Sequence, residues 1–323
     1  MKVLVTGGTG FIGRHLIRAL AEEGHSLKIL VRSREKAPSV SPWGEPIVGD
    51  LTASDTLDQA VDGAQAVIHG AGAIRGNSLQ DFRDGNVVSA RNLAEACLRK
   101  GKSVERFIYF SSLSGFGPSS NDTLPVEDTS PGPVSEYGLS KLEAEQALDR
   151  LLPHVRRIHL RLSAVYGPGD RETLAFFKLG KYGTFFVPGD GEQKIQMLFV
   201  RDAVRSVQAA LINDVRGPFF IAHPRILTYS DLVLAIGNAM GKRLTVIPIH
   251  SAMVMTLAWA NLRLGLLFGW KTMFNPQKAR EILSRRWICS TEKARNMLNF
   301  ECSTDFPEGA RESYRWYKEN RWL

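Results

Sequence analysis

The sequence has little cysteine. Its three cysteines, Cys97, Cys289 and Cys302, are widely spaced, and no two of them form a C-x-x-C motif. An odd number at such spacing argues against both a disulfide framework and a zinc site. We therefore expect no metal centre, and we expect the chain to work in a reducing, cytoplasmic compartment.

The start of the chain lacks the apolar core of a signal peptide. Met1 and Lys2 lead directly into Val3, Leu4 and Val5, and glycines follow at once. This opening is typical of the first strand of a domain rather than of a secretory leader.

One long apolar run occurs near the C-terminus, at 252–270, but Asn261, Arg263 and two glycines interrupt it. Such a segment is a poor candidate for a membrane span. We expect buried helices there, with a peripheral membrane contact or a homodimer face as the alternatives.

The sequence lacks a concentrated basic region. There are 41 Lys and Arg against 33 Asp and Glu, and the resulting net charge of +8 is spread along the chain. No basic stripe is interleaved with aromatic residues, which argues against a nucleic-acid partner. A small anionic ligand would need only a few of these charges.

Short apolar runs alternate with helical patterns over the first 165 residues. Helices are expected at about 11–23 and 136–151, and a loop at 114–133. This alternation predicts an α/β fold with a Rossmann-type, doubly wound parallel sheet, whose strand ends meet at one ligand-binding edge. The expected strands are 2–6, 27–31, 47–48, 66–69, 107–111, 156–165 and, after a helix at 202–211, 218–222.

Regularity weakens after Gly167, which indicates a smaller C-terminal α/β domain for the substrate. We assign 1–166 and 195–225 to the dinucleotide-binding domain, and 167–194 and 226–323 to this cap. Phe176, Phe177, Phe185 and Phe186 lie in the cap. They would either line an apolar substrate site or form the cap core.

A glycine-rich turn follows the first predicted strand. Gly7, Gly10 and Gly13 have the spacing G-x-x-G-x-x-G and open a helix. Glycines at such positions permit a sharp turn, close approach of a pyrophosphate and tight helix–strand packing, while the helix N-terminus presents N–H groups to the anion. The residues predicted to hold the pyrophosphate are Gly7, Thr9, Gly10, Phe11, Ile12 and Gly13.

Arg32 and Arg34 follow the second predicted strand, where a dinucleotide fold meets the adenosine ribose. An acidic residue there would bind a ribose 2′-hydroxyl, whereas arginines suit a 2′-phosphate. We therefore favour NADP(H), with NAD(H) as the alternative cofactor. Arg34 could equally be a solvated residue at a helix start.

Further strand ends add cofactor contacts. Asp50 could accept from the adenine amino group or cap a helix, and Leu51 follows it. Gly70 and Ala71 are small enough for a cofactor to lie against their backbone. His69 beside them is expected to be structural.

The proposed catalytic residues are Ser112, Tyr137 and Lys141. Tyr137 and Lys141 are four residues apart on a predicted helix and share one face, and Ser112 ends the fifth strand. A nearby ammonium is expected to lower the tyrosine pKa toward neutrality, so that the phenol can exchange a proton with a substrate oxygen held by Ser112.

With these motifs in order, the chain resembles the extended short-chain dehydrogenase/reductase superfamily, the NAD-dependent epimerase/dehydratase family. The resemblance covers about the first 210 residues and is loose after 226. It implies that Tyr137 is the acid/base and Lys141 its partner, that both contact the cofactor, and that Asn86 is structural. The matching segments are 6–13, 49–51, 69–71, Asn86 with 91–93, 110–112, Tyr137 with Lys141, and Arg161 with 165–169, which adds Val165 to the predicted cofactor contacts.

Departures from the family pattern reduce the number of activities that the resemblance implies. Sugar-nucleotide members usually carry an asparagine and an arginine where this chain has Ala164 and Ile195, and dehydratases an Asp-Glu pair where it has Leu113 and Ser114. The remaining pattern is similar to dihydroflavonol-reductase-like and 3β-hydroxysteroid-dehydrogenase-like members. We thus expect hydride transfer at the carbonyl or alcohol of a small, apolar or mixed molecule.

Two other functions stay open at this point. The first is an NAD-dependent epimerase of a nucleotide sugar, which would use the same Tyr137 and Lys141. The second is a non-catalytic dinucleotide-binding protein, which the presence of both residues disfavours. A homodimer is expected only by analogy with the family.

Overall fold

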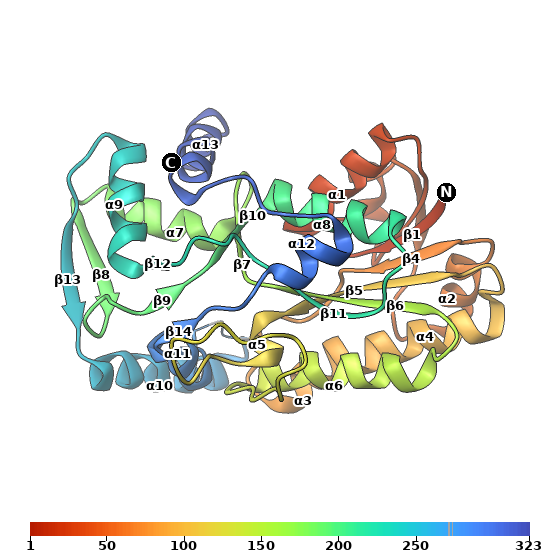
Figure 1. Cartoon of the computed structure of the whole chain (residues 1–323), viewed down its shortest axis with the longest axis horizontal. Coiled ribbons are helices and arrows are strands. Elements are labelled where there is room, and N and C mark those ends of the chain that lie inside the picture. Colours follow the sequence, from red (N-terminus) through yellow and green to blue (C-terminus); the bar gives the residue numbers. More distant parts are fainter. Residues whose placement is uncertain (271, 273) are drawn as a thin grey trace.

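A seven-stranded parallel sheet organises the computed structural model, which describes residues 1–270, 272 and 274–323 (Figure 1). All its pairings are parallel. The strands, in spatial order, are β11 (Gly217–Ile221), β6 (Arg156–Leu162), β5 (Arg106–Ser112), β4 (Ala66–His69), β1 (Lys2–Thr6), β2 (Ser26–Val31) and β3 (Glu45–Val48).

Both faces of this sheet are buried, which is why its strands read as continuous apolar runs. Within β1, Val3 and Val5 join the core on one face while Leu4 joins the core on the other. The first face carries α1 (Phe11–Glu22), α8 (Val200–Ile212) and α12 (Glu292–Leu298), and the second carries α2 (Ser54–Val61), α4 (Ser89–Lys100) and α6 (Glu136–Leu151) (Figure 1). The predicted doubly wound fold is therefore confirmed.

Short helical segments connect the strands near the ligand-binding edge. The predicted loop at 114–133 begins inside a one-turn helix rather than as irregular chain. These connections are η1 (Arg34–Ser39), α3 (Leu79–Phe82), the π-helical η2 (Arg83–Val88) and α5 (Leu113–Phe116).

In the described part of the chain the cap has short strands and five helices, of which three pack around a separate apolar core and two pack in a smaller cluster. Its strand pairs are β8 (Thr184–Pro188) with β13 (Thr245–Ile249), β7 (Ala164–Tyr166) with β10 (Met197–Phe199), and β9 (Lys194–Ile195) with β12 (Leu227–Thr228) and β14 (Arg286–Trp287). Its helices are α7 (Arg171–Gly180), α9 (Tyr229–Met240), α10 (Ser251–Phe268), α11 (Pro276–Leu283) and α13 (Phe306–Glu319).

Three expectations need correction. The strand predicted at 156–165 is interrupted at Ser163, whose N–H bonds to the carbonyl of Ile221, and the chain then leaves the large sheet as β7. The segment of α12 was assigned to the cap, but Ala294 and Leu298 pack in the core of the large sheet.

The third correction concerns the apolar run at 252–270. It forms the single helix α10, of which only 17% of the residues are buried, instead of the buried helices expected. Hydropathy reports the composition of a segment and not what covers it, so sequence alone could not decide this point.

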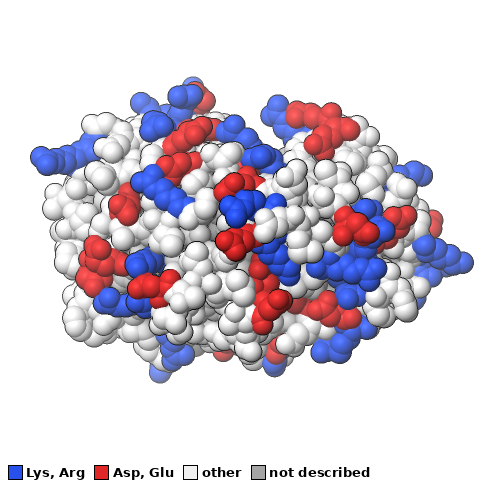
Figure 2. All heavy atoms as spheres, viewed as in Figure 1, with Lys and Arg blue, Asp and Glu red and all other residues white. Residues whose placement is uncertain are grey.

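Charges of both signs are interspersed over the face seen in Figure 2, without a large area of one sign. This agrees with the even spread of Lys and Arg along the chain. The three cysteines are buried as free thiols.

Candidate active site

The glycine turn between β1 and α1 is sterically suited to a close-approaching ligand. Gly7 has φ +79°, and a Cβ there would lie 2.6 Å from the backbone nitrogen of Ala71. A Cβ on Gly13 would lie 2.0 Å from the carbonyl oxygen of Gly7. Only glycine is therefore tolerated at these two positions.

The N-terminus of α1 presents its backbone donors at this turn. Among the described residues, no side chain caps the helix at Gly10, and its first turn contains no acidic residue. The N–H groups there are available to an anion and sit at the positive end of the helix dipole. The site thus fits a dinucleotide pyrophosphate, and all six predicted residues from Gly7 to Gly13 lie in this turn.

Arg32 and Arg34 are exposed just beyond the end of β2, next to β1 in the sheet. Neither forms an ion pair within the described part of the chain. Asp50 follows β3, and one of its oxygens accepts from the backbone and hydroxyl of Thr52 at 2.9 and 2.8 Å. These hydrogen bonds, assisted by Arg32, lower the pKa of Asp50.

The end of β4 brings its small residues against β1. Gly70 donates its N–H to the carbonyl of Thr6, and Ala71 donates to the Thr6 hydroxyl. His69 is buried and bonds to the same hydroxyl at 2.7 Å. Burial, followed by the charge of Lys141, lowers the His69 pKa to about 3, so this ring is neutral and structural.

Ser112 and Tyr137 are brought together where α5 and α6 meet. Ser135 caps α6 by accepting from the N–H of Gly138 at 3.0 Å. A Cβ on Gly138 would lie 2.2 Å from the carbonyl oxygen of Ser114, so glycine permits the close approach of the two segments. Tyr137 and Ser112 lie together, and their side chains share a hydrogen bond that the sequence did not predict.

The expected direction of the Tyr137 pKa was wrong. Burial raises this pKa to about 12, and the hydrogen bond with Ser112 only partly opposes the shift. Lys141 does not offset it, because its Nζ donates to the carbonyl of Phe110 at 2.8 Å and lies 6.0 Å from the centre of the Tyr137 ring. Tyr137 is therefore a protonated phenol at neutral pH.

Lys141 itself is deeply buried. Burial lowers its pKa to about 8, against the favourable charge of Glu145. Its Nζ also lies 4.8 Å from the centre of the Tyr109 ring. One donor is used by Phe110, which leaves others for a ligand hydroxyl.

Asn86 lies at the π-helical turn η2 and fixes the backbone beside the site. Its amide accepts from the N–H of Ala73 at 2.9 Å and donates to the Ala73 carbonyl and to the Ser140 hydroxyl. The asparagine thereby ties the segment after β4 to the helix that carries Tyr137, which agrees with its expected structural role.

A buried ion pair beneath the catalytic residues was missed from the sequence. Glu145 binds Arg161 of β6 at 2.7 Å and accepts from the Ser111 hydroxyl. Glu145 lies four residues after Lys141, on the helix face shared with Tyr137, and this spacing was the sequence signal that could have indicated the ion pair. Val165 lies on β7, just past the end of the strand that carries Arg161.

A second missed group comes from α11, about 140 residues further along the chain. Glu281 accepts from the Ser135 hydroxyl and from Lys278 Nζ, the latter at 2.9 Å. Gln277 accepts from the backbone N–H of Glu136. Both contacts hold the start of α6, and the sequence at 275–281 contains no local motif that would have predicted them.

These cap residues act electrostatically on Tyr137, the proposed proton donor. Glu281 raises and Lys278 lowers the Tyr137 pKa. Burial lowers the pKa of Lys278, but Glu281 outweighs it together with its other acidic neighbours, so the pKa stays above its usual value. Lys278 is a cation at neutral pH beside the phenol.

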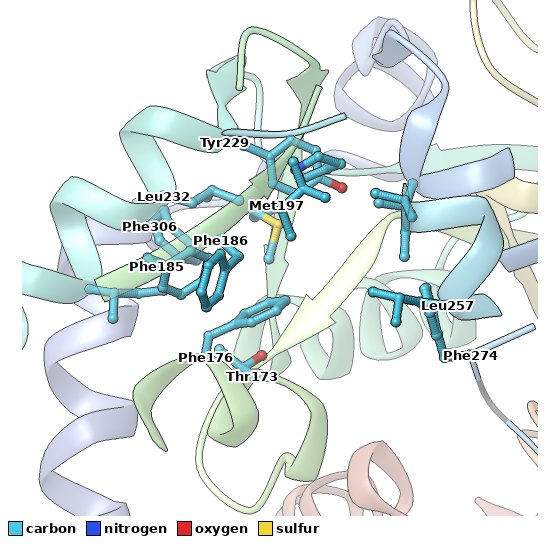
Figure 3. Close-up of a pocket in the computed structure, with 15 residues that line it drawn as sticks. Thr173, Phe176, Phe185, Phe186, Met197, Tyr229, Leu232, Leu257, Phe274 and Phe306 are labelled. Carbon is cyan, nitrogen blue, oxygen red and sulfur yellow. The ribbon is translucent and has the colours of Figure 1, made fainter. Parts of the chain in front are cut away.

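An apolar cavity of about 230 Å³ lies in the cap next to this group. Figure 3 shows Phe176, Phe185 and Phe186 gathered on one side, opposite Leu257 and Phe274. Tyr229 also lines it, and Lys278 and Glu281 both act on the pKa of Tyr229 as they do on that of Tyr137. The cavity is also lined by Ile282 of α11, the helix whose Glu281 accepts a hydrogen bond from Ser135, two residues before Tyr137.

The role of the cap phenylalanines is thus divided. Phe177 is fully buried in the cap core, whereas Phe176, Phe185 and Phe186 line the cavity. Among the described residues, no cluster of three or more His, Cys, Asp or Glu side chains is arranged to hold a metal.

Comparison with known proteins places this arrangement among dinucleotide enzymes. The sequence model of the NAD dependent epimerase/dehydratase family matches residues 3–221. Ceramide reductase of Caulobacter vibrioides is 30% identical over 332 residues, covering 99% of this chain and 96% of that protein. A 3 beta-hydroxysteroid dehydrogenase/Delta 5-->4-isomerase of Mycobacterium tuberculosis is 28% identical, covering 93% and 86%.

Solved structures share the fold over nearly the whole chain. UDP-glucose 4-epimerase of Thermotoga maritima, determined with UDP-glucose, aligns with a TM-score of 0.81 at 21% identity. The alignment covers 99% of this chain and 100% of that one. At this identity the likeness concerns the fold alone.

Proposed function

Because this chain belongs to the NAD dependent epimerase/dehydratase family and is an NAD(P)-dependent oxidoreductase of its extended short-chain type, we propose that it reduces, with NADPH, a carbonyl on a molecule with a long apolar portion. The observation that carries this proposal is the apolar cavity of the cap, whose lining includes Ile282 of α11, the helix that contacts the start of α6 just before Tyr137. Relatives named for ceramide, 2-alkyl-3-oxoalkanoate and sterol substrates support it.

Each of the proposed site residues has a separate role in the reduction of a carbonyl. The nicotinamide, when bound, supplies the hydride for the carbonyl carbon. Tyr137, protonated at neutral pH, donates its proton to the carbonyl oxygen, and Ser112 holds that oxygen as negative charge develops. Lys141 has donors left to hold the ribose hydroxyls.

A panel of 3-oxoacyl substrates of increasing chain length tests the substrate class. With NADPH consumption as the readout, kcat/KM should rise with chain length, since each methylene buried in the cavity contributes about 0.8 kcal/mol. A flat series, or no turnover with any chain length, would contradict the proposal.

The preference for NADPH is supported by the two exposed arginines after β2 and by the absence of an ion pair to them in the described part of the chain. We expect NADP(H) to raise the melting temperature more than NAD(H) does, and Arg32→Asp to reverse the order. A larger NAD(H) shift in the unmutated protein would refute the preference.

Nucleotide-sugar epimerisation is the second candidate, because the structures that share the fold include UDP-sugar epimerases. Against it, Ala164 and Ile195 replace the usual diphosphate contacts, and the cavity is lined almost entirely by apolar side chains. Tight binding of UDP-glucose in the presence of NAD would restore this candidate, whereas we expect none.

A further inference from the structure

Helix α10 covers one side of the cavity with its inner face and leaves the rest of its surface uncovered. It is the only helix in the described part of the chain that is long and apolar enough to cross a membrane. Val254 and Ala258 pack against Ala279 of α11. The large apolar side chains of α10 that are exposed, here called the docking face, are Met253, Leu257, Trp259, Leu264, Leu266, Leu267 and Phe268.

A membrane-spanning arrangement does not fit this helix. Its 18 residues are near the lower limit for a span, which usually takes roughly 20. Arg263 lies in its second half, and one face is fixed to α11. Its two ends continue into β13 and α11 of the folded cap. A helix of this kind can lie in the plane of a bilayer surface with only its outer face immersed.

The chain segment that contains α10 is rich in basic residues. Positions 232–280 contain six Lys or Arg residues and no Asp or Glu. Arg263 on the helix and Arg280 on α11 are exposed. Asp81, the acid found at the far end of the helix, accepts hydrogen bonds from Asn77 and Ser78. An apolar face flanked by cations matches the surface of a bilayer that contains anionic lipid.

The same cationic flank disfavours a second copy of this chain as the occupant. In a symmetric dimer the docking face would contact the docking face of the other copy. The cations around α10 would then face their own copies, and the segment 232–280 contains no acid to pair with them. In Figure 2 the lower left margin, where Figure 1 places α10, is mainly uncharged, with basic and acidic groups above it.

The cavity reaches the docking face. Leu257 belongs to both, since it lines the cavity and is still 53% exposed. Phe186 of β8 lines the cavity from the opposite side and is also exposed (Figure 3). The exposed Val246 and Ile247 of β13, which pairs with β8, extend the apolar surface at this end.

We propose that the docking face of α10 seats the protein on an anionic phospholipid surface, with the cavity open toward the bilayer. The role of this seating, delivery of a lipid carbonyl into the cavity, rests on the proposed function. The seating itself depends only on the exposed apolar residues and the charges around them.

Flotation with vesicles tests the seating. We expect the full chain to float with vesicles of phosphatidylcholine and phosphatidylglycerol and to remain largely free with phosphatidylcholine alone. The double variant Leu264→Glu/Leu267→Glu should lose flotation, with an affinity lower by at least tenfold. Leu267 is 75% exposed and neither residue lines the cavity, so folding and the turnover of a short, water-soluble substrate should be retained.

Two further variants separate the causes. Arg263→Glu should weaken vesicle binding by roughly fivefold or more, because each basic residue near an anionic surface contributes about that factor. Ile212→Glu, placed at the end of α8 where Ile212 is 78% exposed, is the matched control and should float normally.

The outcomes distinguish the seating from the proposed function. Flotation without turnover of any carbonyl substrate would support the seating and refute the function. Failure of the full chain to float would overturn the seating even if long-chain carbonyls are reduced. A dimer by sedimentation that the double variant converts to a monomer, without vesicle binding, would assign the face to a second copy and likewise overturn it.

Discussion

The dinucleotide half and the cap place their apolar side chains differently. In the first, alternate residues of β1 enter cores on opposite faces of the sheet, and helices cover both. In the cap, aromatic residues form a core, line a cavity and also reach the surface. The difference teaches that cofactor binding here depends on backbone geometry, which tolerates no side chain, whereas substrate binding depends on side chains that can change singly.

The largest expected effect comes from a substitution in the glycine turn, which tests whether cofactor binding depends on backbone geometry. Gly13→Val places a side chain where even a Cβ would lie 2.0 Å from Gly7 oxygen. Cofactor binding should be lost, and overpacking should destabilise the protein by roughly 1–3 kcal/mol. Calorimetric titration with NADPH and urea unfolding measure the two effects. Gly132→Ala, where an added Cβ meets no atom within 4 Å, is the control; cofactor binding by Gly13→Val would refute the account of the turn.

Tyr137→Phe tests the proposed proton donation, which takes place between the dinucleotide half and the cap. Removing the phenol oxygen should lower kcat by roughly a hundredfold to ten-thousandfold while NADPH binding is retained. Because burial raises the Tyr137 pKa to about 12, the unmutated enzyme should not lose its acid as the pH rises to 10. Tyr182→Phe, at an 85% exposed cap position, should be neutral. Turnover by Tyr137→Phe comparable to the unmutated enzyme would exclude this proton donor.

Lys141→Met should separate activity from stability. Burial lowers the folded-state pKa from 10.5 to about 8, so the unfolded chain holds this proton more tightly and the charged form destabilises the fold at pH 7. We expect the substitution to raise the free energy of unfolding by roughly 2–3 kcal/mol at pH 7 and to abolish activity.

The stability gain should shrink as the pH rises from about 8 to 10.5, because the unmutated lysine then loses its proton on folding. Urea unfolding at pH 7 and pH 10 measures this, with the exposed Lys102→Met as control. A loss of stability at pH 7 would show that the bond to Phe110 outweighs burial.

The smallest expected effect comes from a substitution in the cap, which tests whether a single side chain of the cavity contributes to substrate binding. Phe186→Ala removes one wall of the cavity at a partly exposed position, so stability should change little. KM for a long-chain substrate should rise about fivefold to tenfold, and KM for a short one should stay unchanged. Leu234→Ala, exposed on α9 and outside the cavity lining, is the control. Equal changes for both chain lengths would argue that Phe186 does not contact the chain.

Much of the dinucleotide half was predictable because its information is local. Alternating apolar runs indicated the parallel strands, and parallel strands end at one edge, so the order of the glycine turn, Ser112 and Tyr137 was enough to bring them together. The rest depended on distant packing. The raised pKa of Tyr137 follows from its burial, and the cations and acids near it come partly from α11, which carries no motif.

The contacts of α11 with the first turn of α6 couple substrate recognition to proton donation. Glu281 and Gln277 hold Ser135 and Glu136, the residues directly before Tyr137, while Ile282 beside Glu281 lines the cavity. Because α11 and the start of α6 are joined by these contacts, we expect a molecule that displaces α11 also to shift Tyr137. Selectivity in this enzyme should therefore show itself in kcat among ligands that bind equally well, so that poor substrates act as inhibitors rather than as weak binders.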